Sequence, residues 1–237
     1  MNVFTTTLRL RNKDVNLHRR LRTSTLFEVL QEASIRHTEE LGMGRVMTLD
    51  RGLLWVVTLQ RAEVARMPAY DETITVETWA GNTMHLLFPR YYRVLGEDGE
   101  TLLSASALWA LVDQEARRMV FPDRYGVTID GVVTGNEIPL PSPPKKAAGE
   151  ASSFTVPFSY VDLNGHMNNT HYFDLAEDLL APAAAGRELR ALETEYASEA
   201  RLGDTLTVTV EEKEDGVFLV SGDTDRKVFR MRFTYAV

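Results

Sequence analysis

Two short stretches of the chain decide its fold: Asp162-Leu163-Asn164-Gly165-His166 and, 148 positions earlier, Asp14-Val15-Asn16-Leu17-His18. They share the spacing Asp-x-Asn-x-His. Each follows a segment in which apolar and polar residues alternate as in a strand, residues 3–11 in the first half and 153–160 in the second. A repeat of this length predicts two similar domains in tandem.

Each copy of the repeat also precedes a predicted helix. In the first half, Thr25 and Glu28 have the spacing of a capping box for a helix over residues 23–42. In the second half, Asn168 or Asn169 can cap a helix that carries apolar residues at helical spacing. Because both helices have a wide apolar stripe, we expect each of them to lie against a sheet.

Strands are predicted after each helix. Apolar and polar residues alternate over residues 73–78 and 205–210. Further strands are expected at residues 85–94, 101–113, 216–221 and 227–235. Each half is therefore predicted to contain one strand, one long helix and a run of antiparallel strands. This order is typical of the α+β class, with one helix packed on one curved sheet.

The two halves are separated by a proline-rich stretch. Residues 131–153 contain four prolines, followed by Lys145 and Lys146. Such a composition does not form a regular element and predicts an extended linker. The linker divides the chain into two predicted domains, residues 1–130 and 154–237.

The composition excludes several classes of protein. None of the 237 residues is cysteine, which excludes a disulfide framework, a cysteine-ligated metal and a thiol nucleophile. The net charge of −8 argues against nucleic-acid binding. No apolar run approaches the roughly 18 residues of a membrane span, and the first residues lack the apolar segment of a secretion signal. We therefore expect a cytoplasmic protein with neither nucleic acid nor membrane as a partner.

The segments described above resemble the acyl-acyl-carrier-protein thioesterases of plants and bacteria, which are built as two fused hotdog domains. The resemblance is most specific in residues 23–32 with His37, 54–68, 73–79, 162–169 and 192–200. In a hotdog domain, a curved antiparallel sheet wraps a long central helix. The resemblance thus implies a tandem hotdog fold of the α+β class, with an acyl pocket in the first domain and the catalytic residues in the second.

Thioester hydrolysis needs an activated water, a stabiliser of the oxyanion and an apolar slot for the acyl chain. Asp162, Asn164 and His166 are spaced to share one side of an extended segment, which then enters a helix N-terminus suited to an oxyanion. The resemblance implies that these three residues are catalytic together with Glu199 on the following strand. We expect Glu199 to activate or orient the water and Asn164 to hold the water or the carbonyl. Asp162 and His166 would orient and polarise them, and direct nucleophilic attack by a carboxylate stays open.

The first copy of the motif does not predict a second active site. At an offset of 132 residues, Met67 takes the place of Glu199. The copy formed by Asp14, Asn16 and His18 therefore lacks a carboxylate partner. We expect a single functional site, in the second half.

The resemblance gives the first half a different role, which is to shape the acyl pocket. Leu53 and Trp55, together with one face of residues 23–37, are expected to line it. In the second half, Asn168 and Asn169 are expected to contact the substrate.

The predicted reaction is release of a free fatty acid from acyl-carrier protein, with no cofactor and no metal. An acyl-CoA thioesterase of the same fold, an enoyl-thioester hydratase and a non-catalytic acyl-binding protein remain as alternatives. Carrier proteins are acidic, so docking predicts a basic patch. Its candidates are Arg19, Arg20, Arg22, Lys145, Lys146 and Arg201. Pairing of the two hotdogs within one chain leaves both a monomer and a homodimer possible.

Overall fold

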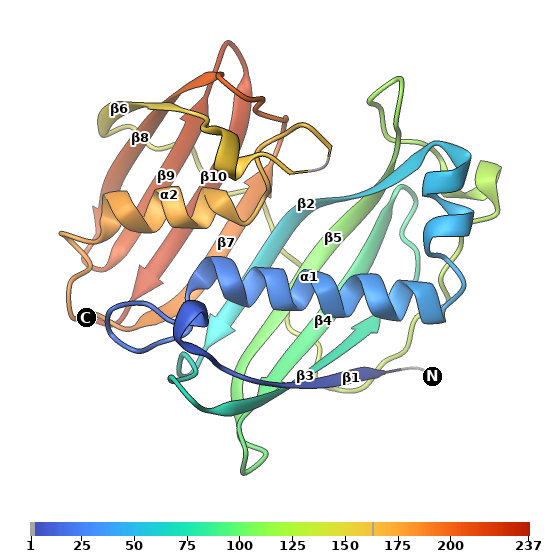
Figure 1. Ribbon diagram of the computed structural model, residues 1–237, viewed down its shortest axis with the longest axis horizontal. Coiled ribbons are helices and arrows are strands. Elements are labelled where there is room, and N and C mark those ends of the chain that lie inside the picture. Colours follow the sequence, from blue (N-terminus) through green and yellow to red (C-terminus); the bar gives the residue numbers. More distant parts are fainter. Residues whose placement is uncertain (1–2, 163) are drawn as a thin grey trace.

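The computed structural model describes residues 3–162 and 164–237, and its strands form one antiparallel sheet (Figure 1). The first half contributes β1 (Phe4–Arg9), β2 (Leu53–Val64), β3 (Thr73–Ala80), β4 (Leu87–Leu95) and β5 (Thr101–Asp113). The second half contributes β6 (Glu150–Thr155), β7 (Leu189–Tyr196), β8 (Thr205–Glu214), β9 (Val217–Asp223) and β10 (Lys227–Tyr235). Helices α1 (Thr23–Glu40) and α2 (His171–Leu180) cover the same face of the sheet.

The order of the strands repeats between the halves. The first half has the order β1-β3-β4-β5-β2, and the second half has the matching order β6-β8-β9-β10-β7. The halves join where β2 and β7 pair antiparallel, with Arg61 opposite Glu193. The guanidinium Nη1 of Arg61 lies 3.3 Å from Oε1 of Glu193. This is the tandem hotdog arrangement expected from the sequence, and that expectation is confirmed.

The two helices meet near the centre of the molecule. The rings of Phe27 on α1 and Phe173 on α2 stack with their centroids 4.4 Å apart. Beside this stack, Nδ2 of Asn169 donates a hydrogen bond of 3.0 Å to Oε1 of Gln31. Apolar residues at helical spacing, such as Leu30, are buried against the sheet as predicted. None of the helices in the described residues has the length and apolarity that crossing a membrane requires.

Both predicted helix caps differ from what the structure contains. Helix α1 begins at Thr23, so Thr25 and Glu28 lie inside its first turns and form no capping box. In the second half, the side-chain oxygen of Asn168 accepts hydrogen bonds of 3.0 Å from the amide and the hydroxyl of Thr170. Asn168 therefore organises the turn that precedes α2 instead of capping the helix itself.

The predicted linker crosses the sheet on the face away from the helices (Figure 1). Ser106 of β5 donates to the carbonyl of Pro139, and the amide of Ala147 donates to Ser221 of β9. The last residues assigned to the linker, 150–153, belong to β6, while residues 158–160 form a short 3-10 helix where a strand was expected. Strands β5 and β10 have the predicted ends.

Candidate active site

The second copy of the motif closes a tight turn. The amide of Asp162 donates to the carbonyl of His166 at 2.9 Å, and the amide of Gly165 donates back to the carbonyl of Asp162 at 3.0 Å. Gly165 has a φ of 81°, in the left-handed region that glycine adopts without strain. Leu163 lies outside the described residues. The expectation that the motif side chains share one side of an extended segment is therefore wrong.

Two motif side chains bind each other within this turn. Oδ1 of Asp162 accepts the amide of Asn164 at 2.8 Å, and Oδ2 of Asp162 lies 3.3 Å from Nδ2 of Asn164. Both residues line a cavity that extends into the first half of the molecule. The turn thus presents a carboxylate and an amide together at one end of that cavity.

The third motif residue, His166, pairs with Glu199 instead. Nε2 of His166 lies 2.9 Å from Oε2 of Glu199. His166 is buried, whereas the side chain of Glu199 is 39% exposed. Glu199 lies in the loop after β7, not on the strand as expected, because β7 ends at Tyr196. The chain then turns towards the motif, where Arg201 pairs with His166 in an isolated bridge.

The surroundings of His166 favour its neutral form. Burial is the largest cause that lowers the pKa of His166, and the charges of Arg117 and Arg201 lower it further. The carboxylates of Glu199 and Asp162 act in the opposite direction. His166 therefore stands between two carboxylates and two guanidinium groups.

One of these four groups, Arg117, comes from the other half of the molecule. Arg117 follows β5 and donates from Nη1 to Oε1 of Glu199 at 3.1 Å. The sequence shows Arg117 and Arg118 as a basic pair after a predicted strand, but nothing in that pattern connects the pair to Glu199. Only the folded chain brings the two together.

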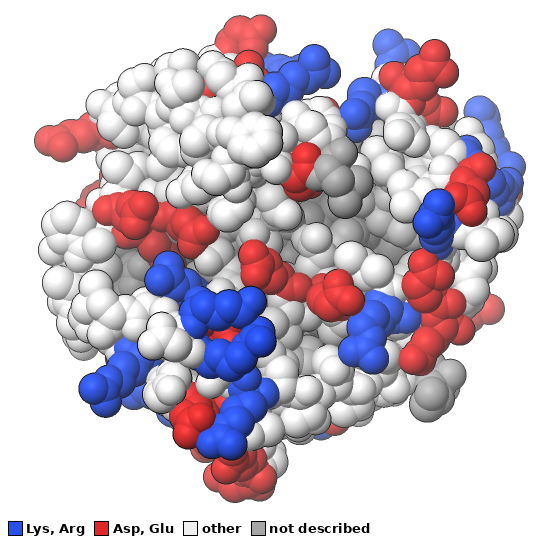
Figure 2. All heavy atoms as spheres, in the orientation of Figure 1, with Lys and Arg blue, Asp and Glu red and all other residues white. Residues whose placement is uncertain are grey.

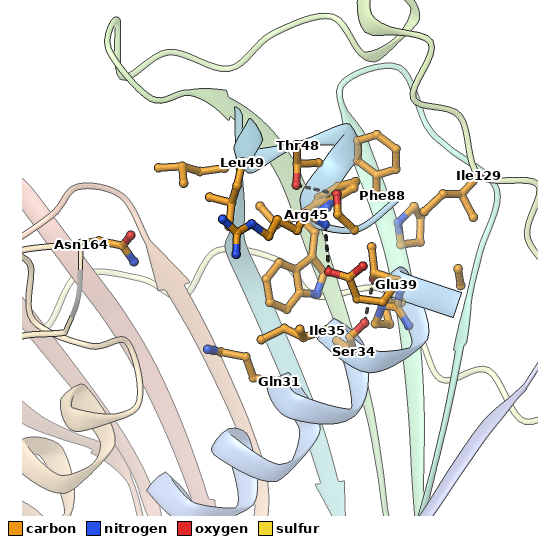
Figure 3. A pocket seen from close by; sticks show the side chains of 18 of the residues that line it. Gln31, Ser34, Ile35, Glu39, Arg45, Thr48, Leu49, Phe88, Ile129 and Asn164 are labelled. Carbon is orange, nitrogen blue, oxygen red and sulfur yellow. Dashed lines mark hydrogen bonds between the residues drawn. The ribbon is translucent and has the colours of Figure 1, made fainter. Parts of the chain in front are cut away.

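The cavity has a volume of about 350 Å³, within the range of small-molecule pockets (Figure 3). It extends from Asn164 at one side to Ile129 at the other. Most of its walls come from α1, the two short 3-10 helices that precede β2, and strands β2 to β5. The first-half lining includes Gln31, Ser34, Ile35, Thr38, Leu49, Leu54, Trp55, Phe88 and Trp109. The second half contributes Asp162, Asn164 and Asn168.

The predicted substrate-binding residues are placed as follows. Trp55 lines the cavity and donates from Nε1 to the carbonyl of Met43 at 3.0 Å. Leu53 is fully buried in the core, and its neighbour Leu54 lines the cavity together with Trp55. Asn168 belongs to the lining, whereas Asn169 reaches it through its hydrogen bond to Gln31.

One part of the wall is polar and was not foreseen from the sequence. Arg90 of β4 is 4% exposed and lines the cavity. Its guanidinium contacts Nδ1 of His37 at 2.9 Å and donates to the hydroxyl of Thr38 at 2.9 Å. Burial lowers the pKa of Arg90 below its ordinary value. These contacts fix the orientation of α1 over β4 beside the cavity.

In the structure, the two copies of the motif correspond with a register that differs from the one given by the shared sequence Asp-x-Asn-x-His. The bridge between Val161 and Met167 has its counterpart between Val15 and Leu21, which is an offset of 146 and not 148. The left-handed residue Gly165 corresponds to Arg19, whose φ is 58°. Asp162, Asn164 and His166 therefore correspond to Asn16, His18 and Arg20.

The corrected register leaves the counterpart of Glu199 unchanged and leaves Asp14 outside the matching positions. The bridge between His166 and Arg201 corresponds to that between Arg20 and Ala69, so the match of Glu199 with Met67 is retained. Asp14 has a local role, because its Oδ2 accepts the amide of Arg11 at 2.8 Å. The first half thus has neither carboxylate at the matching positions.

The predicted basic candidates do not gather in one patch. Figure 2 shows a group of basic side chains over the loop between β1 and α1, where Arg19, Arg20 and Arg22 are exposed. Lys146 lies on the linker and pairs with Asp223 at 3.2 Å. Arg201 is the candidate that adjoins His166.

Sequence comparison places both halves in one protein family. The acyl-ACP thioesterase N-terminal domain matches residues 1–123, and the acyl-ACP thioesterase C-terminal domain matches residues 144–230. A chloroplastic acyl-[acyl-carrier-protein] hydrolase, FATB3 of Cuphea viscosissima, is 28% identical over 213 residues, which is 83% of this chain and 52% of that protein. A chloroplastic palmitoyl-acyl carrier protein thioesterase of Gossypium hirsutum is 27% identical over 214 residues, with the same coverage of 83% and 52%. The chain spans about half the length of these curated relatives.

Solved structures show the same fold. An acyl-ACP thioesterase from Bacteroides thetaiotaomicron superposes with a TM-score of 0.84 at 22% identity, covering 99% of this chain and 98% of the other. The 12:0-ACP thioesterase from Umbellularia californica gives a TM-score of 0.79 at 22% identity, covering 99% and 94%. The compartment expected from the sequence stays a prediction. The double hotdog fold and the match of both domains establish that the chain belongs to the acyl-ACP thioesterase family.

Proposed function

We propose that the chain hydrolyses the thioester of fatty acyl-acyl-carrier protein and releases the free fatty acid. The observation that carries this proposal is the cavity of about 350 Å³ that ends at Asp162 and Asn164. An acyl chain needs a slot that excludes water, and the thioester carbonyl needs a carboxylate and a hydrogen-bond donor at its mouth. The names of the relatives, which are acyl-carrier-protein hydrolases, support the same reaction.

We assign water activation to Asp162. Asp162 lines the cavity at the end where the acyl carbonyl would lie, whereas Glu199 contacts His166 and Arg117. As the water oxygen bonds to the acyl carbon, a proton passes from the water to Asp162. The side-chain amide of Asn164 stabilises the oxyanion. The carbon–sulfur bond then breaks, and the sulfur takes up the proton to leave the thiol and the fatty acid.

His166 and Glu199 support this chemistry from behind the turn. The backbone carbonyl of His166 accepts the amide of Asp162, so both residues belong to one hydrogen-bonded turn. Glu199 in turn orients the imidazole through its contact of 2.9 Å. In this proposal Glu199 acts through His166 and does not contact the substrate.

The test is release of free thiol from a panel of acyl-carrier-protein and acyl-CoA thioesters, with the wild type beside Asn164→Ala and Glu199→Ala. We expect turnover of the carrier-protein thioesters that falls strongly in Asn164→Ala and less in Glu199→Ala. Turnover restricted to the CoA thioesters would show that the substrate is an acyl-CoA and not an acyl-carrier protein. A folded wild type with no turnover on either set would overturn hydrolysis.

A further inference from the structure

The loop after β5 reaches from the first half of the molecule to the catalytic half. Nη1 of Arg117 donates to Oε1 of Glu199 at 3.1 Å, while the other oxygen of Glu199 lies 2.9 Å from Nε2 of His166. The side chains of Arg117 and Glu199 are 36% and 39% exposed. An ion pair this exposed contributes little to the stability of the fold. Its effect is therefore to be sought in the orientation of Glu199.

The loop that carries Arg117 is held in one conformation by its own hydrogen bonds. Oδ1 of Asp113 accepts the amides of Glu115 at 3.0 Å and Ala116 at 2.7 Å. The amide of Arg117 donates to the carbonyl of Asp113 at 2.9 Å, and the amide of Gln114 donates to the carbonyl of Gly52 at 2.8 Å. The turn thus presents the Arg117 side chain from a fixed base.

The backbone of Arg117 adopts a conformation that suits glycine better. Its φ is 53°, in the left-handed region that an L-residue with a long side chain enters only at a cost in free energy. Such conformations persist where the surrounding structure imposes them and are frequent at functional sites. A glycine here would relax the turn but would remove the contact with Glu199.

We propose that Arg117 is a positioning residue of the candidate site, which holds one oxygen of Glu199 so that the other faces His166. The first half then supplies part of the machinery as well as the cavity. The catalytic meaning of this contact rests on the proposed function, but the contact itself can be tested without it.

The charge of Arg117 gives the contact a second, measurable consequence. The groups that face His166 are Glu199 and Arg201 from the loop after β7, Arg117 from the loop after β5, and Asp162 from its own turn. Of these, Arg117 lowers the pKa of His166. Removal of the guanidinium should therefore raise that pKa, whereas removal of a merely structural side chain would leave it unchanged.

The experiment compares Arg117→Gly, Arg117→Lys and the control Arg118→Ala. Arg118 is the exposed neighbour in the same loop, and glycine accepts the left-handed φ of residue 117. We expect Arg117→Gly to fold as well as the wild type and to lower kcat about ten- to hundredfold with little change in KM. The acid limb of kcat/KM and the NMR titration of the His166 ring, assigned with His166→Gln, should both move to higher pH. Arg117→Lys should restore part of each effect, and Arg118→Ala should cause none.

Two outcomes would overturn the inference. One is an Arg117→Gly variant whose kcat and His166 titration match those of the wild type. The other is an Arg118→Ala variant that changes both as much as Arg117→Gly does. Because the titration needs no turnover, a wild type that hydrolyses no thioester would refute the proposed function and still leave the contact between Arg117, Glu199 and His166 to be judged by NMR.

Discussion

The turn that carries Asp162 and the matching turn of the first half share their backbone hydrogen bonds, yet they differ in every chemical group. Where the second half has Asp162, Asn164 and His166, the first half has Asn16, His18 and Arg20. The side chain of Asn16 accepts the amides of His18 and Arg20, and Asn16 does not belong to the lining of the cavity. The backbone of the repeat is thus independent of the chemistry placed on it.

The two helices differ in a complementary way. By the same offset of 146, the last residue of α2, Leu180, matches Ser34 of α1. The α1 residues beyond that point include Ile35, Thr38 and Glu39, and all three line the cavity. The extra turns of α1 provide walls for which α2 has no counterpart. One half therefore holds the cavity, and the other half places its reactive groups at the mouth.

The strongest test of this division of roles is Asp162→Asn beside Asn16→Asp. Loss of the carboxylate at the cavity mouth should lower kcat by about 10²–10⁴-fold, the usual contribution of a general base. A carboxylate added at position 16 should leave kcat unchanged, because that turn does not border the cavity. Steady-state kinetics on acyl-carrier-protein thioesters would measure both. Equal activity of Asp162→Asn and the wild type would show that another group activates the water.

A stability difference is expected where one contact occurs in two chemical forms. The side chain of Gln31 accepts a hydrogen bond from Asn169. At the positions related by the same offset of 146, Glu177 accepts a hydrogen bond from the hydroxyl of Thr23. Burial raises the pKa of Glu177 to about 7, above its value in the unfolded chain. The folded chain therefore binds the extra proton more tightly, and the stability that this proton provides is complete at low pH and is lost as the pH rises through 7.

Glu177→Gln makes the second copy resemble the first. At pH 8 the substitution should stabilise the fold by about 1–2 kcal/mol and raise Tm by about 2–8 °C. At pH 4.5 the two proteins should have nearly the same Tm. Thermal unfolding followed by circular dichroism across this pH range gives the answer. A constant difference at all pH values would mean that the carboxyl of Glu177 does not titrate in the folded chain.

The length of the cavity can be changed without touching the turn. Ile129 lies at the end away from Asn164, so Ile129→Trp should shorten the space for the acyl chain (Figure 3). One methylene in an apolar pocket is worth about 1–3 kcal/mol, so the preference should move to shorter chains by about tenfold or more. Ile129→Val serves as the control and should move it the other way or not at all. Competition between acyl chains of different length in one reaction would show the shift.

The smallest effect is expected at the turn of the first half. Asn16→Ala removes a side chain that accepts amides at 3.0 Å and 3.2 Å, and should lower the free energy of unfolding by about 1 kcal/mol. Its kcat should equal that of the wild type. Urea denaturation and the thioesterase assay on one preparation would separate the two quantities. A loss of activity larger than the loss of stability would give the first turn a role in catalysis.

The fold was largely predictable because local patterns determine it. Residues 101–113 and 227–235 form β5 and β10 with the ends predicted. The register of the repeat was not predictable in the same way. Asp-x-Asn-x-His occurs in both halves, but the backbone aligns Arg19 with Gly165, and an arginine gives no sign in the sequence that its φ is positive.

The candidate site was predictable only in part. The motif and its resemblance identify Asp162, Asn164, His166 and Glu199, but they do not show that the first two form one pair and the last two another. That division follows from a turn whose hydrogen bonds have no sequence signature. The contact with Arg117 depends on the packing of two halves, and residues 82 positions apart leave no local pattern.

The junction of β2 with β7 also has a consequence during synthesis, because β2 is made well before its partner strand. The two strands are separated by about 125 residues, so β7 emerges roughly 6–25 s after β2 at usual rates of translation. During that time β2 is an open edge to which another chain could add a strand. Arg61 and Glu63 stand on this strand and pair with each other at 2.7 Å, and charges at such a position discourage foreign pairing. Until β7 with Glu193 has been synthesised, the charges on β2 thus oppose the addition of a strand from another chain.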